Sequence, residues 1–181
     1  MRYLPVEFGF FVTDTFGYQQ WRGGTHWGND YGRQGGSGGR PIYAAQGGTV
    51  TKAGPASGFG QWINIDHPTA DGSGLTVYGH IIPEVRVGQR VEAGQRIGYI
   101  NPDSTTNGGT RQKPIAPHLH FEVHRSVWSQ PGPDRLDPTP WFAGAAWPGQ
   151  PAPPPPAIPA VDENDDVWWS AILTQLIGER R

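Results

Sequence analysis

The chain has 181 residues, about one domain with some chain left over, and it contains no cysteine, which excludes disulfides and thiolate metal ligands. Its formal net charge of −2 at pH 7 provides no electrostatic basis for binding nucleic acid or an anionic membrane. The 27 glycines and 19 prolines favour short strands joined by turns, and the eight tryptophans can supply core area that the modest aliphatic content does not.

The first residues, MRYLPVEFGFFVTD, contain an apolar run that Glu7 and Gly9 interrupt. No basic region precedes an apolar run of signal-peptide length. We therefore expect no signal peptide and no membrane insertion. On this interpretation the protein is made in a host cytoplasm and needs another route of delivery if it acts outside the cell.

Residues 1–145 are predicted to form one β-rich unit, because strand candidates follow one another with small turns between them and no strong helical period. The candidates are PIYAAQGGTVTKAG, GQWINIDHP, GLTVYGHI and VRVGQRVEAGQRIGYI. The polar stretch 101–114 predicts an exposed loop just before the next strand. Loops in such a position often border a binding site.

The stretch APHLHFEVH (116–124) alternates strictly between apolar and polar residues. One face of the predicted strand points to the core and carries Leu119, Phe121 and Val123, and the other carries His118, His120, Glu122 and His124. Two imidazoles at i and i+2 can reach one metal ion, whereas His124 lies about 20 Å from His118. We expect His124 to be a surface histidine, and Glu122 either to orient a metal ligand or to face solvent.

A second polar cluster, GGTHWGNDYG, places His26 and Asp30 four residues apart. Its glycines argue against a helix and favour a tight turn between two strands, in which an imidazole and a carboxylate can meet. Nitrogen and oxygen ligands without sulfur suit zinc, and three protein ligands leave one coordination position open, as in catalytic sites. His80, in VYGHI, is a further candidate at a strand end, and His67 is interpreted as structural.

The motifs THWGNDYG, YGHI and APHLHFEVH, in this order, resemble the M23 family of zinc endopeptidases, the lysostaphin-like peptidoglycan hydrolases. The connecting strand candidates and the closing LDPTPWF extend the resemblance over about residues 8–142. The resemblance implies a mainly β fold, in which an antiparallel β-sheet carries a long groove.

The resemblance also implies roles for five residues. One zinc ion per chain would be bound by His26, Asp30 and His120. His80 and His118 would be catalytic, as general base and as donors to the developing oxyanion, and no H-E-x-x-H helix offers a glutamate as an alternative base.

Two features depart from the family pattern. The family usually has a short turn rich in Ser, Thr and Gly before H-L-H, and here NPDSTTNGGTRQKPIA replaces it and is expected to wall the groove. A tyrosine upstream of the first zinc ligand sometimes assists such enzymes, and Tyr18 is the candidate.

The composition changes near residue 146. Residues 146–161 predict an extended Pro-rich linker, and residues 162–181 predict a short amphipathic helix. An isolated helix of this length is marginal in water, so we expect it to dock on its own domain, on a second copy of the chain or on a partner.

The function implied by the resemblance is zinc-dependent hydrolysis of peptide bonds in bacterial peptidoglycan. Glycine bridges, links from D-Ala to diaminopimelate and stem bonds all fit it equally. A cell-wall hydrolase without an export signal favours a bacteriophage product, either an endolysin or a tail-associated lysin that residues 162–181 anchor to virion tail proteins. Two alternatives are a catalytically silent wall-binding or virion structural module on the same fold, and a biotinyl-type carrier, which lacks the required Met-Lys acceptor here.

Overall fold

The computed structural model describes residues 1–150, which form thirteen β-strands, a 3₁₀ turn at Thr69–Asp71 and one short helix, α1 (Pro138–Trp141). The first six strands are β1 (Phe11–Asp14), β2 (Gly17–Gln19), β3 (Gly24–His26), β4 (Asn29–Gly32), β5 (Pro41–Tyr43) and β6 (Gly48–Ala56). The others are β7 (Gly60–Asp66), β8 (Leu75–Gly79), β9 (Ile81–Pro83), β10 (Arg90–Val91), β11 (Arg96–Ile100), β12 (Leu119–His124) and β13 (Arg135–Leu136).

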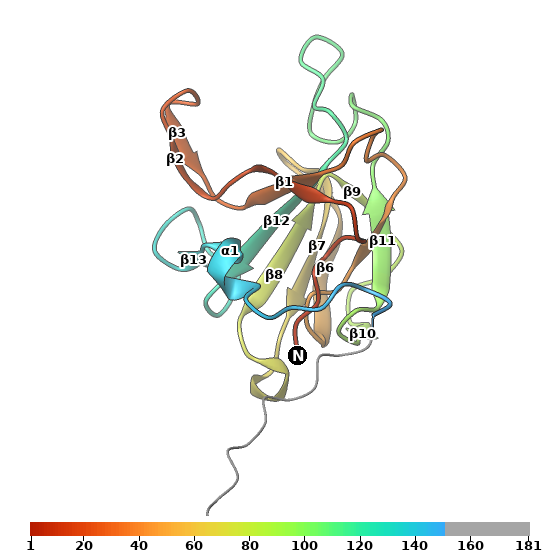
Figure 1. Ribbon diagram of the computed structural model, residues 1–181, viewed down its shortest axis with the longest axis vertical. Helices are drawn as coiled ribbons and strands as arrows, with labels where there is room; N and C mark the ends of the chain where they lie inside the picture. The colour runs from red at the N-terminus through yellow and green to blue at the C-terminus, as the bar shows by residue number, and fades with distance from the viewer. Residues whose placement is uncertain (151–181) are drawn as a thin grey trace, which may run out of the picture.

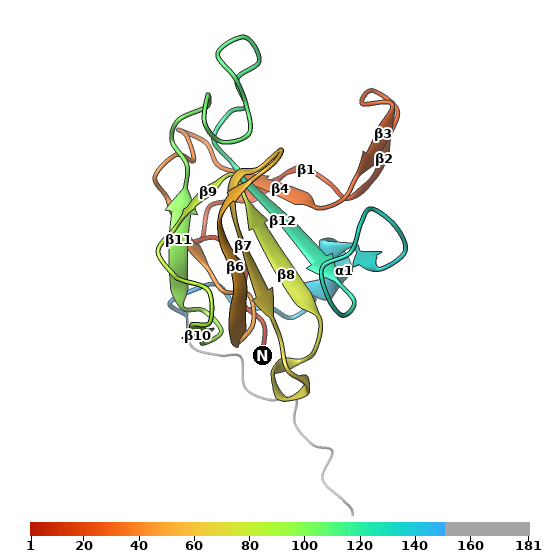
Figure 2. The ribbon, with the colours of Figure 1, turned by 180° about the vertical axis from the view of Figure 1, so that it is seen from behind.

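These strands form three antiparallel sheets. The composition predicts the short strands, and the family resemblance implies their antiparallel arrangement. The largest has eight strands, with β1, β4, β12, β8, β7, β6 and β10 side by side and β13 paired with the end of β12. A three-stranded sheet in the order β5, β11, β9 lies beside it (Figure 1). The β2–β3 hairpin projects from the body of the molecule, and so does the loop between β11 and β12 (Figure 1, Figure 2).

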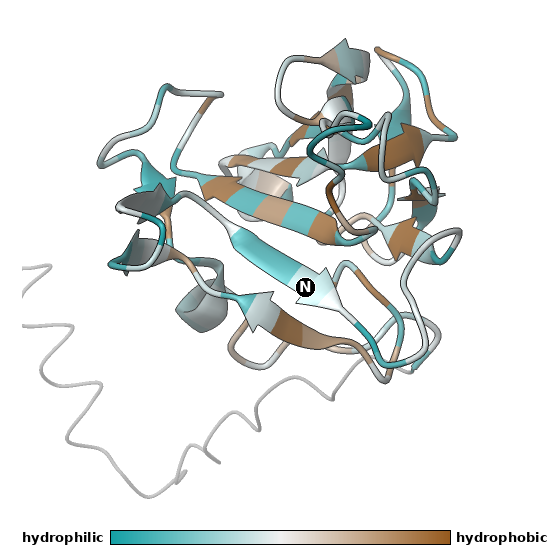
Figure 3. Ribbon diagram, turned by 90° about the horizontal axis from the view of Figure 1, so that it is seen from above, coloured by the Kyte–Doolittle hydropathy of each residue, from teal (hydrophilic) through white to brown (hydrophobic). Residues whose placement is uncertain are grey.

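The core lies on one face of the large sheet. Leu119, Phe121 and Val123 of β12 are buried there, as the period of two predicts. Hydrophilic and hydrophobic residues alternate along the strands (Figure 3). Neighbouring strands and the small sheet complete the core cluster with Ile42, Ile63, Ile65, Tyr78, Ile81, Ile97 and Ile100.

Within residues 1–150 no tryptophan is among the buried residues of this core, contrary to the expectation from composition. Trp141 and Trp147 pack against its edge, and Trp21 is 74 % exposed. Branched aliphatic side chains fill the space between the sheets, because they suit a pleated surface.

A buried tyrosine gives the fold a testable dependence on pH. The Tyr78 side chain is fully buried, and its hydroxyl accepts hydrogen bonds from the Ala45 backbone N–H (2.8 Å) and the Thr76 hydroxyl (3.1 Å). Burial raises the pKa of Tyr78 to about 12. In an unfolded chain the tyrosine pKa is about 10, so stabilisation by the neutral phenol is complete below pH 10 and is lost as pH rises to 12.

We expect ionisation of Tyr78 to lower the free energy of unfolding by about 2–3 kcal/mol. Burial also raises the pKa of Tyr31 to about 12, so ionisation of Tyr31 adds to this loss. Urea unfolding of the wild-type protein and of Tyr78→Phe at pH 9 and pH 12 measures it. The variant should lose less stability between the two pH values. An equal loss in both proteins would contradict the prediction.

No helix within residues 1–150 is long and apolar enough to cross a membrane. The predicted C-terminal helix (162–181) and most of the predicted linker lie outside the described residues. At the start of that linker, Ala146 pairs with Tyr3 in an isolated bridge.

Candidate metal centre

Two distant segments meet on the outer face of the large sheet. His26 ends β3, Asp30 lies in β4, and a tight turn joins the two strands, as predicted. Asp30 is the direct cross-strand partner of His120 on β12. The turn passes so close to β12 that a side chain at Gly28 would clash, because a Cβ there would lie 2.8 Å from the His120 ring and closer still to the Phe121 carbonyl oxygen. Glycine is therefore required where the turn crosses the strand.

The three predicted ligands converge on one point. The distance from His26 Nε2 to Asp30 Oδ1 is 3.2 Å, and the distance from His120 Nδ1 to the same oxygen is 2.8 Å. The two imidazole nitrogens are 3.1 Å apart. Four ligands around zinc at bond lengths of 2.0–2.1 Å are spaced by about 3.3 Å in a tetrahedral arrangement. The observed spacing is close to this value.

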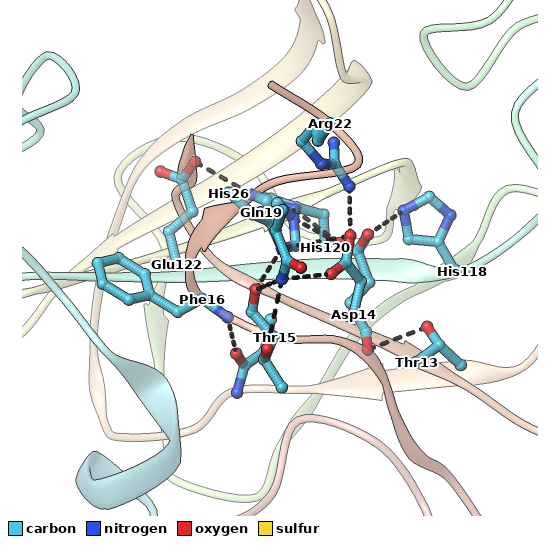
Figure 4. Close-up of polar contacts among 12 residues, drawn as sticks. Thr13, Asp14, Thr15, Phe16, Gln19, Arg22, His26, His118, His120 and Glu122 are labelled. Carbon is cyan, nitrogen blue, oxygen red and sulfur yellow. Dashed lines mark hydrogen bonds and ion pairs between the residues drawn. The ribbon is translucent and has the colours of Figure 1, made fainter. Parts of the chain in front are cut away.

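In both His26 and His120, the outward ring nitrogen, which points away from the other two ligands, already has a hydrogen-bond partner. His26 Nδ1 lies 3.1 Å from the Thr15 carbonyl oxygen, which can only accept, so Nδ1 carries the proton (Figure 4). His120 Nε2 donates in the same way to Glu122 Oε1 at 3.1 Å (Figure 4). Both inward nitrogens are thus left to bind a cation, and neutral imidazole with a carboxylate is a donor set that suits zinc.

The electrostatics of the site also favour a positive charge. Burial alone would raise the pKa of Asp30, but its interactions with the three surrounding histidines hold it well below its usual range. Burial alone would lower the pKa of His120, but hydrogen bonds to Asp30 and Glu122 outweigh it and raise the pKa to about 9. The carboxylate stays ionised, and the proton on His120 Nδ1 is the charge that a metal ion would replace.

Behind His120 lies a buried ionic network that fixes its orientation. Glu122 is 2 % exposed and accepts hydrogen bonds from His120 Nε2, from His124 Nε2 (2.8 Å) and from Arg135 Nη1 (2.7 Å). Burial alone would raise the pKa of Glu122, but the two histidines lower it to about 2. Of the two alternatives for Glu122, the geometry supports orientation of a ligand.

The expectation that His124 is a surface histidine is wrong. His124 is 1 % exposed, and its Nδ1 lies 3.1 Å from the Ser129 backbone N–H. The loop between β12 and β13 folds over this part of the sheet, since Arg135 also donates from Nε to the Ser129 carbonyl oxygen at 3.2 Å. Strand periodicity identifies the face on which His124 lies but not the segment that covers it.

The two predicted catalytic histidines border the triad. His118 Nε2 is 3.5 Å from Asp30 Oδ2 (Figure 4). His118 Nδ1 donates to the Ala116 carbonyl oxygen at 2.7 Å. The ring centroid of His80 is 4.6 Å from that of His118 and 6.0 Å from that of His120. Burial, followed by the electrostatic effect of the neighbouring imidazoles, lowers the pKa of His80 to about 4. His80 is therefore neutral at pH 7.

The loop 101–114 does more than border the site. Most of it is exposed, as predicted, but Asn107 is fully buried and its carbonyl oxygen accepts a hydrogen bond from His80 Nδ1. The Asn107 side chain anchors the loop by donating to the Ile115 carbonyl oxygen at 2.9 Å. His80 has a backbone φ of 62°, a left-handed conformation that is uncommon outside glycine. Sequence reasoning missed Asn107, because a backbone carbonyl leaves no signature in residue type.

Two further predictions concern Tyr18 and His67. Tyr18 lies on the projecting β2–β3 hairpin with 71 % of its surface exposed, and within residues 1–150 it makes no hydrogen bond to the triad. His67 is buried and bonded to the Gly47 carbonyl oxygen (2.8 Å) and the Thr76 hydroxyl (2.9 Å). The structural interpretation of His67 is consistent with these contacts.

Comparisons with known proteins find solved structures with a similar fold. The catalytic domain of the antimicrobial peptidase lysostaphin from Staphylococcus simulans is 28 % identical and has a TM-score of 0.57, with 74 % of this chain and 92 % of that domain covered. LytU is 27 % identical, with 73 % and 83 % covered and a TM-score of 0.56. A zinc containing peptidase from Vibrio cholerae shares the fold at 24 % identity and a TM-score of 0.54, with 76 % of this chain and 39 % of that one covered.

The family model of Peptidase family M23 matches residues 24–133, more than half of the chain. This range contains the triad and both neighbouring histidines. The mostly antiparallel β architecture is that of the lysostaphin catalytic domain. On the match of this family model, the chain belongs to peptidase family M23.

Proposed function

We propose that this protein is a zinc-dependent endopeptidase that hydrolyses peptide bonds in bacterial peptidoglycan. One observation carries the metal assignment: His26 Nε2, Asp30 Oδ1 and His120 Nδ1 meet at 2.8–3.2 Å with their outward partners already engaged. The peptidoglycan assignment is supported by family membership and by the likeness to the lysostaphin catalytic domain.

When bound, zinc would polarise the scissile carbonyl and lower the pKa of a water molecule to about 7. The chain's own residues would move the protons. The Nδ1 atoms of His118 and His80 donate to the carbonyl oxygens of Ala116 and Asn107, which leaves each Nε2 as a proton acceptor. One of these imidazoles would take a proton from the attacking water and return it to the leaving amine nitrogen.

The two histidines, His118 and His80, differ in their exposure to solvent. His118 is partly exposed, with 17 % of its side-chain surface accessible, whereas His80 is buried and neutral at pH 7. His118 is therefore the better placed of the two to exchange protons with solvent after turnover. Once protonated, the second imidazole would donate a hydrogen bond to the negative charge that develops on the carbonyl oxygen.

Digestion of purified peptidoglycan of known chemistry tests this function. We expect the zinc-loaded protein to release fragments in which mass spectrometry finds one new amino terminus and one new carboxyl terminus, at a peptide bond. Removal of zinc with a chelator should stop the release, and added zinc should restore it. Binding to the wall without any cleavage would instead identify a catalytically silent wall-binding module.

The biological setting is a separate proposal. We propose a bacteriophage lysin, either released from the infected cell or carried on the virion tail. The tail version is supported by residues 146–161 and 162–181, which combine a Pro-rich stretch with an amphipathic pattern suited to anchoring. Deletion of residues 150–181 tests whether this segment anchors the protein. Loss of the protein from purified virions supports the tail, and unchanged localisation with lower solubility supports docking of the helix on its own domain.

A further inference from the structure

The metal triad is one end of a longer row of side chains across the sheet. Asp30 on β4 pairs with His120 on β12, His120 pairs with Gly79 on β8, and Gly79 pairs with Trp62 on β7. Directly paired residues of neighbouring strands point to the same face of a sheet. Trp62 therefore lies on the same outer face as the two metal ligands, two strands away from His120.

Aromatic rings fill the distance between the triad and Trp62. Phe59 covers Gly79 so closely that a Cβ there would collide with its ring. The Phe59 ring centroid lies 5.5 Å from that of His120 and 5.7 Å from that of Trp62, to which it is nearly parallel at 26°. Trp128, from the loop between β12 and β13, meets Trp62 edge to face at 6.2 Å. We name Phe59, Trp62 and Trp128 the aromatic strip.

The strip is anchored and accessible. Ser129, next to Trp128, is bonded to His124 and Arg135, the two residues that also hold Glu122 behind His120. Trp128 is 38 % exposed, and Phe59 and Trp62 are partly buried. A partly exposed aromatic surface that begins beside the candidate metal site suits an uncharged ligand with one apolar face, which can pack on a ring while its polar groups stay in water.

The sheet topology indicates which part of the substrate this ligand is. Strands β7 and β8 each have a neighbour on both sides, so they offer no unpaired backbone groups to an extended peptide. The first strand in the sheet, β1, has within residues 1–150 a partner only in β4, and it lies on the opposite side of the triad. There Phe11 and Thr13, together with Asp30 and His118, border a cavity of about 470 Å³. Of the two edges of the large sheet, the one formed by β1 lies beside the triad, because β8, β7 and β6 separate the triad from the other edge at β10. A peptide whose scissile bond lies at the triad would therefore pair with β1.

We propose that the aromatic strip binds the sugar rings of the glycan chain to which the peptide substrate is attached. The C–H face of an N-acetylhexosamine ring is flat and apolar and would stack on the indole and phenyl rings, while its hydroxyl groups stay in water. This proposal rests on the proposed function, since a peptidoglycan substrate carries both parts.

The test compares two substrates that differ only in their sugar: a cross-linked stem peptide, and the same peptide carrying its disaccharide. In Trp128→Ala, the ratio of kcat/KM for the sugar-bearing substrate to kcat/KM for the bare peptide should fall about tenfold, the size of one lost aromatic contact. Trp62→Phe, which keeps an aromatic ring, should lower the ratio less. Trp21→Ala is the matched control, because Trp21 is an exposed tryptophan in the turn of the β2–β3 hairpin and is not part of the aromatic strip.

An unchanged ratio in Trp128→Ala would overturn the proposal, because it would mean that the strip contacts the peptide or nothing. A second measurement does not depend on cleavage. A tetramer of N-acetylglucosamine, titrated into the wild-type protein, should shift the indole N–H resonances of Trp62 and Trp128 in NMR spectra and leave that of Trp21 in place. If the wild type cleaves neither substrate, the proposed function fails, and the titration still decides whether the strip binds sugar.

Discussion

Replacing His120 or Asp30 with alanine is expected to remove zinc binding and peptidase activity together. These residues supply two of the three converging donor atoms, which are 2.8 Å apart, and the two protein donors that would remain do not complete a catalytic zinc site. The zinc content should fall from one ion per chain to none, as measured by atomic absorption on dialysed protein. Circular dichroism checks that the β-sheet fold is retained.

The matched variant is His118→Ala, two residues before His120 on the same segment. Its imidazole lies beside the triad, 3.5 Å from Asp30 Oδ2, but is not one of the three converging ligands. We expect it to keep its zinc while kcat falls by about 10²–10⁴-fold, the usual loss for a general base. Loss of zinc in His118→Ala, together with normal turnover in His80→Ala, would reverse the roles assigned here.

Replacing Glu122 with glutamine is expected to weaken zinc affinity about 10–100-fold, the usual effect of removing the partner of a metal-bound histidine. Glutamine keeps the shape of the side chain but removes the negative charge that accepts from His120 Nε2 and balances Arg135. Zinc affinity is measured by competition with a chromophoric chelator at fixed pH. The visible spectrum of the cobalt-substituted protein reports the ligand geometry independently of activity.

Glu84→Gln is the control for this experiment. Glu84 pairs with Arg96 on the exposed surface, where such a pair contributes little. Its removal should leave zinc affinity unchanged. If Glu122→Gln also binds zinc as tightly as the wild type, the buried network stabilises the fold without acting on the metal site.

The alkaline instability that Tyr78 confers would report on the core alone, because its ring lies on the opposite face of the sheet from the triad. One face of β8 therefore lies in the core, and the other lies on the side of the candidate metal site. Phe121, the direct partner of Tyr78 on β12, is buried in the core, whereas His120, one residue earlier, lies at the site. The effect of a core substitution on stability can therefore be measured without assuming that the substitution alters the candidate metal site.

The sequence by itself determined the fold class and the residues proposed as metal ligands. Alternation in LHFEVH places His120 on the face opposite Phe121, and the glycines of GGTHWGNDYG indicate a turn that brings His26 and Asp30 together. Such local patterns are readable because backbone geometry imposes them within a few residues. The order of the three motifs along the chain was specific enough to indicate the family to which the chain belongs.

Only the tertiary structure decided what surrounds these residues. It buries His124 and Glu122 beneath the β12–β13 loop, supplies the Asn107 carbonyl oxygen that holds His80, and aligns Trp62 with the metal ligands across four strands. Each of these depends on contacts between segments far apart in the sequence. The residue types within one segment do not predict which distant segment will pack on it. Burial, protonation state and the extent of the binding surface are therefore known only once the sheet is assembled.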